Sequence, residues 1–337
     1  MPVLAFVCGC AGLSLTAWEK SFFREAQPWG LILFKRNVDN PAQLSELTAS
    51  FRNAVGRDNA PVFIDQEGGR VQRLGPPHWP LYPSGASYLA TAGDVEGAEK
   101  LVRLTAQLIA SDLLAVGITV DCLPVLDLTY PESHKVIGDR SYGRDPAAVA
   151  RLGRAAADGL LAAGVLPVMK HLPGHGRAQS DSHLELPVVD VPVGELESSD
   201  FAPFIVNADL PIGMSAHVVY PALDPERPAT ISPKIIGEII RGKIGFDGLL
   251  LSDDLSMQAL SGTLPERATA ALRAGIDVVL HCNGNPDEME TVAKVTPPLA
   301  GRALERAEAA LGRLQPPANF DSVDARARLN CALAMAG

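Results

Sequence analysis

A short stretch at residues 170–183, KHLPGHGRAQSDSH, gathers three histidines, a lysine, an arginine and an aspartate. Asp181 and His183 are two residues apart, so an extended backbone would place both side chains on one side. A carboxylate beside an imidazole fixes the tautomer and stabilises the protonated ring, which suits a general acid/base near neutral pH. The same spacing is equally typical of a loop held by an Asp–His hydrogen bond. The spacing alone therefore leaves both roles open.

A second reactive stretch is LLLSDDLSM, in which Ser252, Asp253 and Asp254 follow three leucines that indicate a buried strand. Adjacent residues on a strand point to opposite sides, so at most one of the two aspartates can face the protein interior. We expect the other aspartate to cap a helix or hold a loop. The inward carboxylate would serve as a nucleophile on the anomeric carbon of a sugar, or as a metal ligand.

A metal site is the main alternative for the histidine-rich stretch. His171, His175, His183 and Asp181 are ligand types that zinc accepts. However, no tight ligand spacing such as HExxH occurs, and glycine-rich turns do not hold His171 and His175 on one helical face. The acid/base interpretation is favoured, and we expect no metal and no other cofactor.

These residues need a scaffold, and one pattern recurs along the chain. A helix-like stretch ends at a glycine, a short apolar run follows, and polar residues appear where that run stops, as in a βα unit. Eight such apolar runs begin at Val3, Trp29, Ala60, Val116, Ala162, Leu210, Gly245 and Ala274. Between them, Asp145-Pro146 and Ser232-Pro233 predict helix starts, and Thr263 with Glu266 predicts a capping box.

The fold class predicted is α/β, a (β/α)8 barrel of the TIM type. No linker or change of composition divides the 337 residues. We therefore expect one catalytic domain over residues 1–337, with a C-terminal helical segment from about residue 301 packed on it. An open doubly wound sheet is disfavoured because no GxGxxG turn follows the first strand.

In such a barrel, catalysis takes place at the carboxyl ends of the strands. The chain has many polar residues there. They are Lys35, Arg36, Asp65, Glu67, Asp127, Lys170, His171, His217, Asp253, Asp254 and His281. Any one of them alone is more often a helix cap, a solvated charge or a buried structural histidine. Their convergence on one face is what predicts an active site.

Composition narrows the class of partner. The formal net charge is −10 and no basic stripe occurs, which argues against a nucleic acid or an anionic membrane as partner. No uncharged apolar run approaches the roughly 20 residues of a membrane span. The apolar N-terminus has no Lys or Arg before Lys20, so we interpret it as a buried strand rather than a signal peptide. Five scattered cysteines fit reduced thiols, and we expect a cytoplasmic protein.

Four motifs in order resemble those of family-3 glycoside hydrolases, specifically the single-domain bacterial β-N-acetylglucosaminidases of the NagZ type. The motifs are DQEGGRVQRL, VIGDRSYGRDP, KHLPGHG followed by DSH, and SDDLSM. The resemblance covers nearly the whole chain. This sequence departs from the family at Leu172, where phenylalanine is usual. We expect no C-terminal sandwich domain of the kind that many family-3 β-glucosidases carry.

The resemblance implies a retaining exo-β-N-acetylglucosaminidase with a covalent glycosyl-enzyme intermediate. Its substrate would be terminal N-acetylglucosamine on β-1,4-linked anhydro-N-acetylmuramyl fragments, with or without peptide, in peptidoglycan recycling. Asp253 matches the nucleophile, His183 the acid/base residue and Asp181 the partner that orients it. Matches to sugar-holding positions are Asp65, Arg73, Arg140, Lys170 and His171, with His217 beside the site.

Three alternatives remain at this point: a β-glucosidase-like family-3 hydrolase, a metal-dependent barrel hydrolase using His171, His175 and Asp253, and a catalytically silent sugar-binding barrel. The last is disfavoured because the positions of the nucleophile and the acid/base are both filled. We expect a monomer or weak dimer that acts on a small glycan. Gly174 and Gly176 are expected to let the loop move over bound substrate.

Overall fold

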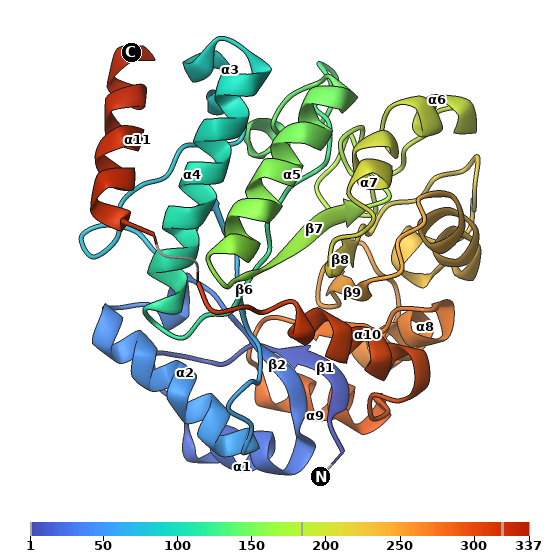
Figure 1. Cartoon of the computed structure of the whole chain (residues 1–337). Coiled ribbons are helices and arrows are strands. Elements are labelled where there is room, and N and C mark those ends of the chain that lie inside the picture. The colour runs from blue at the N-terminus through green and yellow to red at the C-terminus, as the bar shows by residue number, and fades with distance from the viewer. Residues whose placement is uncertain (1, 183–184, 318–319, 337) are drawn as a thin grey trace.

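The computed structural model of the chain describes residues 2–182, 185–317 and 320–336 (Figure 1). Within those residues, eight parallel strands form a closed barrel in the order β1-β10-β9-β8-β7-β6-β3-β2. Their bounds are β1 Leu4–Cys8, β2 Pro28–Leu33, β3 Val62–Ile64, β6 Val120–Asp121, β7 Leu166–Leu172, β8 Ile212–Ser215, β9 Leu249–Asp254 and β10 Val278–His281. Each strand overlaps one of the eight apolar runs, so the predicted (β/α)8 barrel is confirmed. A separate hairpin, β4 Gln66–Gly68 and β5 Val71–Gln72, follows β3.

Helices alternate with the strands along the chain. Their bounds are α1 Ala17–Ala26, α2 Pro41–Val55, α3 Ser87–Ala92, α4 Val95–Leu114, α5 Pro146–Ala162, α6 Val193–Ser198, α7 Ala202–Val206, α8 Leu264–Ala274, α9 Pro286–Val295, α10 Gly301–Gly312 and α11 Ser322–Ala336. Short 3-10 turns occur at η1 Lys35–Asn37, η2 Gly138–Arg140 and η3 Ala229–Ile231, and a π-helix at η4 Ile235–Lys243.

The predicted helix starts are present. The Asp145 carboxylate accepts hydrogen bonds from the first backbone amides of α5, which satisfies donors that the helix itself leaves unpaired. The Ser232 hydroxyl accepts from the amide of Ile235, 3.1 Å away, at the start of η4. At α8, the Glu266 carboxylate accepts from the amide of Thr263 at 2.8 Å, as expected of a capping box.

The core has two layers because successive side chains on a strand point to opposite sides. One set, which includes Val7, Val168 and Ile212, fills the barrel interior. Ala307 and Ala310 of α10 belong to the same cluster, so α10 packs against the barrel interior. The other set faces the surrounding helices and forms the larger cluster.

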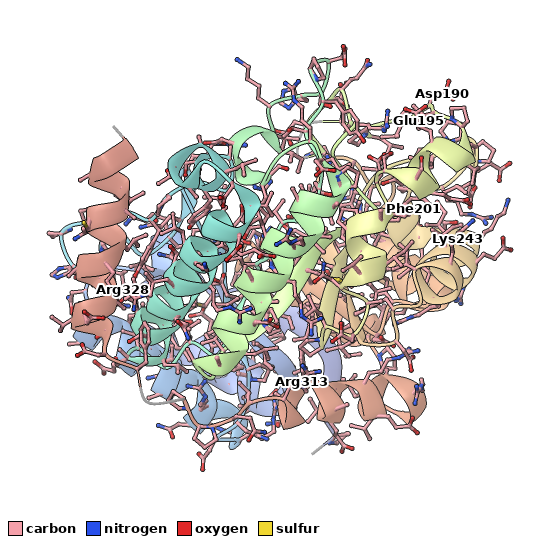
Figure 2. All side chains as sticks on the ribbon, turned by 45° about the horizontal axis from the view of Figure 1, so that its top comes forward. Asp190, Glu195, Phe201, Lys243, Arg313 and Arg328 are labelled. Atoms are coloured by element: carbon pink, nitrogen blue, oxygen red, sulfur yellow. The ribbon has the colours of Figure 1, made fainter. Side chains whose placement is uncertain are left out.

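The C-terminal helix α11 packs on α4 and α3 on the outside of the barrel (Figure 1). Ala325 and Leu329 are buried in this contact, whereas Arg328 points outward (Figure 2). Arg326 donates to the carboxylate of Asp112 at 3.0 Å and anchors the helix. The assignment of residues 1–337 to one domain stays a prediction. Among the described helices, none combines the length and the apolar character that crossing a membrane requires.

Candidate functional site

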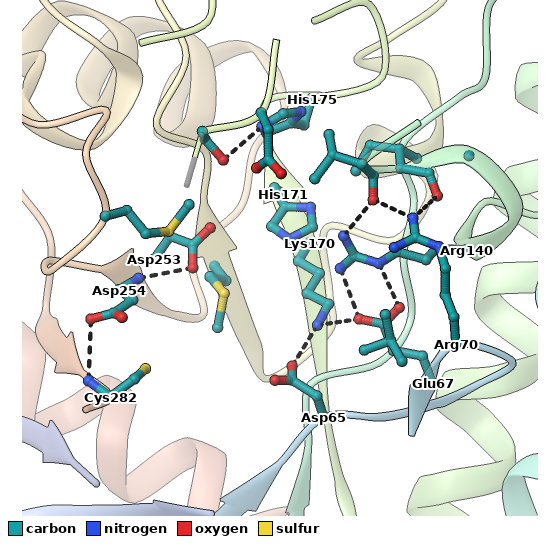
Figure 3. A pocket seen from close by; sticks show the side chains of 18 of the residues that line it. Asp65, Glu67, Arg70, Arg140, Lys170, His171, His175, Asp253, Asp254 and Cys282 are labelled. Carbon is teal, nitrogen blue, oxygen red and sulfur yellow. Dashed lines mark hydrogen bonds and ion pairs between the residues drawn. The ribbon is translucent and has the colours of Figure 1, made fainter. Parts of the chain in front are cut away.

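A pocket of about 980 Å³ lies at the carboxyl ends of the barrel strands (Figure 3). It contains most of the side chains that the sequence placed in the site. These are Asp65, Arg73, Arg140, Lys170, His171, Asp181 and Asp253. His183, the predicted acid/base residue, lies outside the described residues.

Lys170 is the central cation of the pocket. It continues the inward-facing series of Leu166 and Val168 on β7, and its side chain is only 2% exposed. Its ammonium lies 2.8 Å from a carboxylate oxygen of Asp65 and 2.7 Å from one of Glu67. Burial opposes the charged form, but the two carboxylates more than offset it and raise the pKa of Lys170 above its usual value. Lys170 is therefore a fixed ammonium donor.

Two arginines complete an alternating network of charges around Lys170 (Figure 3). Arg73 donates to the second oxygen of Asp65 at 2.8 Å, and Arg140 donates to both oxygens of Glu67, each at 2.8 Å. Burial would raise the pKa of both carboxyl groups, but the adjacent cations lower it below the usual value in each case. The pocket thus has one wall of mutually fixed charges, which can present donors and acceptors to the hydroxyl groups of a sugar.

Asp127 orients the histidine beside this wall. One of its oxygens lies 2.6 Å from Nδ1 of His171, and the other accepts from the backbone amide of His175 at 2.6 Å. Burial raises the pKa of Asp127, but the two histidines outweigh that effect and lower it. His171 follows Lys170 directly, yet both line the pocket, because the pairing register of β7 with β8 shifts between Lys170 and Leu172.

The start of the loop after β7 is closely packed. His175 is buried, with Nε2 lying 3.2 Å from the hydroxyl of Ser182, and burial lowers its pKa to about 4. A Cβ atom added at Gly176 would lie 2.0 Å from the carbonyl oxygen of Leu128. From the sequence we expected Gly176 to let the loop move. In the structure, close backbone packing requires a glycine at this position.

The adjacent aspartates at the end of β9 have different surroundings, as the strand period predicts. Asp253 continues the inward series of Leu249 and Leu251, and one of its oxygens accepts from the backbone amide of Asp254 at 2.8 Å. Asp254 instead holds the loop. Its oxygens accept from the amide and hydroxyl of Ser256, at 3.1 and 2.6 Å, and from the amide of Cys282 at 3.1 Å.

His217 is the predicted site residue that does not line the pocket. It is fully buried; Nδ1 lies 2.8 Å from the hydroxyl of Thr230, and Nε2 lies 3.0 Å from the carbonyl oxygen of Asp254. Both ring nitrogens are therefore occupied by protein atoms. His217 thus supports the end of β9, and its predicted place beside the sugar stays a prediction.

Sequence reasoning missed several residues that build the site. Glu67 and Asp127 were recognised only as strand-end polar residues, and Arg70 was given no role. The signal available for Glu67 was its position two residues after Asp65, within the same motif. In residues 2–182, 185–317 and 320–336, no group of three or more His, Cys, Asp or Glu side chains is placed to hold a metal ion.

Comparison with known proteins gives a consistent result. The profile of the Glycosyl hydrolase family 3 N terminal domain matches residues 15–314. The beta-hexosaminidase of Chromobacterium violaceum is 40% identical over 308 residues, which span 90% of this chain and 85% of that protein. The beta-hexosaminidase of Bordetella avium is 40% identical over 313 residues, with 89% and 86% covered.

Solved structures agree with the sequence matches. NagZ from Neisseria gonorrhoeae, in complex with N-trifluoroacetyl-D-glucosamine, superposes with a TM-score of 0.85 at 34% identity and covers 100% of this chain and 97% of its own. A family 3 beta-N-acetylglucosaminidase from Paenibacillus also superposes with a TM-score of 0.85, at 30% identity, covering 97% of this chain and 67% of its own. The chain therefore belongs to glycosyl hydrolase family 3 and is a glycoside hydrolase of the β-N-acetylhexosaminidase class.

Proposed function

We propose that this hydrolase is a retaining exo-β-N-acetylglucosaminidase in which Asp253 is the nucleophile. The observation that carries the proposal is the position of Asp253, which lies in the pocket opposite the wall formed by Asp65, Glu67 and Arg140 (Figure 3). A sugar that fills the space between them would be held by its hydroxyl groups on one side. Its anomeric carbon would then face the carboxylate on the other.

The reaction needs two steps. In the first, a carboxylate oxygen of Asp253 bonds to the anomeric carbon, the glycosidic C–O bond breaks, and the leaving oxygen takes a proton from His183. In the second, water gives a proton back to His183 and its oxygen bonds to the anomeric carbon, which releases Asp253. Two displacements at one carbon retain the configuration. In this scheme Asp181 orients His183 and stabilises its protonated form.

The relatives support the proposed substrate class. One relative binds N-trifluoroacetyl-D-glucosamine, and two others are beta-hexosaminidases. Motif resemblance extends the proposal to β-1,4-linked N-acetylglucosaminyl-anhydro-N-acetylmuramyl fragments, with or without peptide, which arise during peptidoglycan recycling in the cytoplasm. The reaction as written requires no cofactor.

The test compares an aryl β-N-acetylglucosaminide with the matching aryl β-glucoside, followed by product analysis on a muramyl disaccharide. We expect the acetamido sugar to be hydrolysed faster than the glucoside. The glucoside lacks the amide, so the protein group that pairs with this amide would stay unpaired, which costs about 1–3 kcal/mol. Equal efficiency on both aryl glycosides would favour the β-glucosidase alternative. A muramyl disaccharide left intact would contradict the recycling role alone.

The nucleophile is tested separately. A 2-acetamido-2-deoxy-5-fluoro glycoside, which traps the covalent intermediate of retaining enzymes, should label Asp253, and Asp253→Ala should abolish turnover without changing the melting temperature greatly. Asp58→Ala is the matched control, since Asp58 is exposed and lies before β3, away from the pocket. A label on Asp254 would show that the two adjacent aspartates are assigned in the wrong order.

A further inference from the structure

The side chain of Arg70 is half-exposed, yet its guanidinium contacts a carboxylate and several backbone carbonyl oxygens. Its Nε donates to a carboxylate oxygen of Asp139 at 2.8 Å. Its Nη2 contacts three successive carbonyl oxygens, those of Lys135 at 2.7 Å, Val136 at 2.6 Å and Ile137 at 3.2 Å. One guanidinium group therefore ties together the turn at residues 135–139.

This turn forms one side of the pocket and leads directly into Arg140. Residues 134–140 all line the pocket. The carbonyl of Val136 is shared by two arginines, because Arg140 Nη1 also donates to it, at 3.1 Å (Figure 3). The remaining nitrogens of Arg140 hold Glu67, and Glu67 contacts Lys170. A chain of contacts thus runs from Arg70, through the turn, to the centre of the charged wall.

The backbone that carries Arg70 is itself fixed. Arg70 lies in the turn between β4 and β5, next to Gly69, whose amide donates to the carbonyl of Tyr82 at 2.9 Å. Gly69 has φ +58°, and a Cβ atom there would lie 2.6 Å from the Cβ of Ser84. The turn is therefore held against the following segment, and Arg70 extends from a defined base.

We propose that Arg70 is a positioning residue that places Arg140 for sugar binding. This inference rests on the proposed function, in which Arg140 belongs to the wall that holds the sugar. The guanidinium is suited to the task because its planar donors reach several acceptors at once, whereas a lysine ammonium is a single point of charge. Arg70→Lys keeps the charge and loses the geometry.

The first experiment is a double-mutant cycle on kcat/KM with an activated aryl β-N-acetylglucosaminide. Arg70→Ala and Arg70→Lys should each lower kcat/KM roughly 10- to 100-fold, because small misplacement of a binding group is costly. In an Arg140→Lys background, Arg70→Ala should lower kcat/KM by no more than about twofold. Arg151→Ala is the matched control, since the guanidinium of Arg151 also donates to a carboxylate, that of Glu99, but lies on α5 outside the pocket.

If the losses of kcat/KM in the two single variants multiply in the double variant, the proposal is overturned, because Arg70 then acts independently of Arg140. Full activity of Arg70→Lys would overturn it as well, since charge alone would then suffice.

The second experiment does not depend on activity. Amide hydrogen exchange of residues 134–141 should become faster in Arg70→Ala and stay unchanged in Arg151→Ala. Unchanged exchange in both variants would refute the proposal that Arg70 holds this turn. If the wild type fails to cleave N-acetylglucosaminides, the proposed function fails, but the exchange result still decides whether Arg70 holds the turn.

Discussion

Replacing Glu67 by glutamine tests the charged wall most directly. Glu67 is 2% exposed and faces two cations, with Arg140 bound to both of its oxygens and Lys170 at 2.7 Å. In the wild type, the carboxylates of Asp65 and Glu67 balance part of the charge of three cations. After the substitution, Asp65 is the single carboxylate that contacts Lys170 and Arg73, and Arg140 has lost its carboxylate partner. Uncompensated positive charge then remains on the buried side chains of Lys170 and Arg140.

The expected loss is large because the pair is buried. Removing one partner of a buried ion pair costs about 3–5 kcal/mol. For a chain of 337 residues the unfolding entropy near the melting temperature is about 0.7 kcal/mol per kelvin, so Tm should fall by about 4 to 7 °C. Activity should fall with it, since Lys170 and Arg140 lose their common partner.

The chain supplies a matched control for burial. Glu99 also receives two hydrogen bonds from one arginine, Arg151, at 2.7 and 2.8 Å, but the two side chains are 28% and 53% exposed. Glu99→Gln should therefore cost at most about 1 kcal/mol, because solvent screens exposed pairs. Thermal unfolding of both variants at pH 7 gives the comparison. Equal small losses would refute the view that burial makes the Glu67 contacts strong.

Acid provides an independent check on the same variant. The pKa of Glu67 is lowered in the folded state, so its stabilising effect is present above the pKa of about 4.3 in the unfolded chain and is lost as pH falls through the folded value. Glutamine does not titrate. The difference in unfolding free energy between wild type and Glu67→Gln should therefore shrink below about pH 4.

Three further outcomes are expected. Burial lowers the pKa of His175 to about 4, so the folded state binds fewer protons than the unfolded chain between about pH 6.5 and 4, and stability falls as pH drops through that window. His175→Gln should remove about 3 kcal/mol of this pH dependence, measured by urea unfolding across that pH range. Gly176→Ala should lower Tm and activity because its Cβ would collide with the Leu128 carbonyl, while Gly194→Ala, which meets nothing within 4 Å, serves as control. Hydrolysis should persist in a metal chelator, and a loss that zinc restores would contradict the proposed reaction.

The barrel could be predicted because its signals are local. Each strand is a short apolar run, and the polar residues at its end mark the catalytic face. The period of two along β9 also separated Asp253 from Asp254, since it depends only on neighbouring residues. Lys170 and His171 were placed in the site in the same way, from the end of a single strand.

The contacts of the site that could not be predicted join residues that are distant in the chain. Glu67 and Arg140 are 73 residues apart, and Asp127 and His171 are 44 apart. No local pattern identifies such partners, so Glu67 and Asp127 resembled ordinary strand-end charges. The same holds for His217, because its position at the end of a strand does not reveal that its ring nitrogens contact Thr230 and the carbonyl oxygen of Asp254.

The closure of the barrel has a consequence for biosynthesis. β1 pairs with β10, so one edge of the first strand has no partner until residues 278–281 have been synthesised, and α10 follows only afterwards. A chain that stops on the ribosome before that point exposes two open sheet edges and an uncovered apolar interior, which are the surfaces that chaperones bind and that aggregate. The two sides of the pocket come together only when the eight-stranded barrel has closed. A newly made chain is therefore expected to hydrolyse substrate only after β10 has paired with β1.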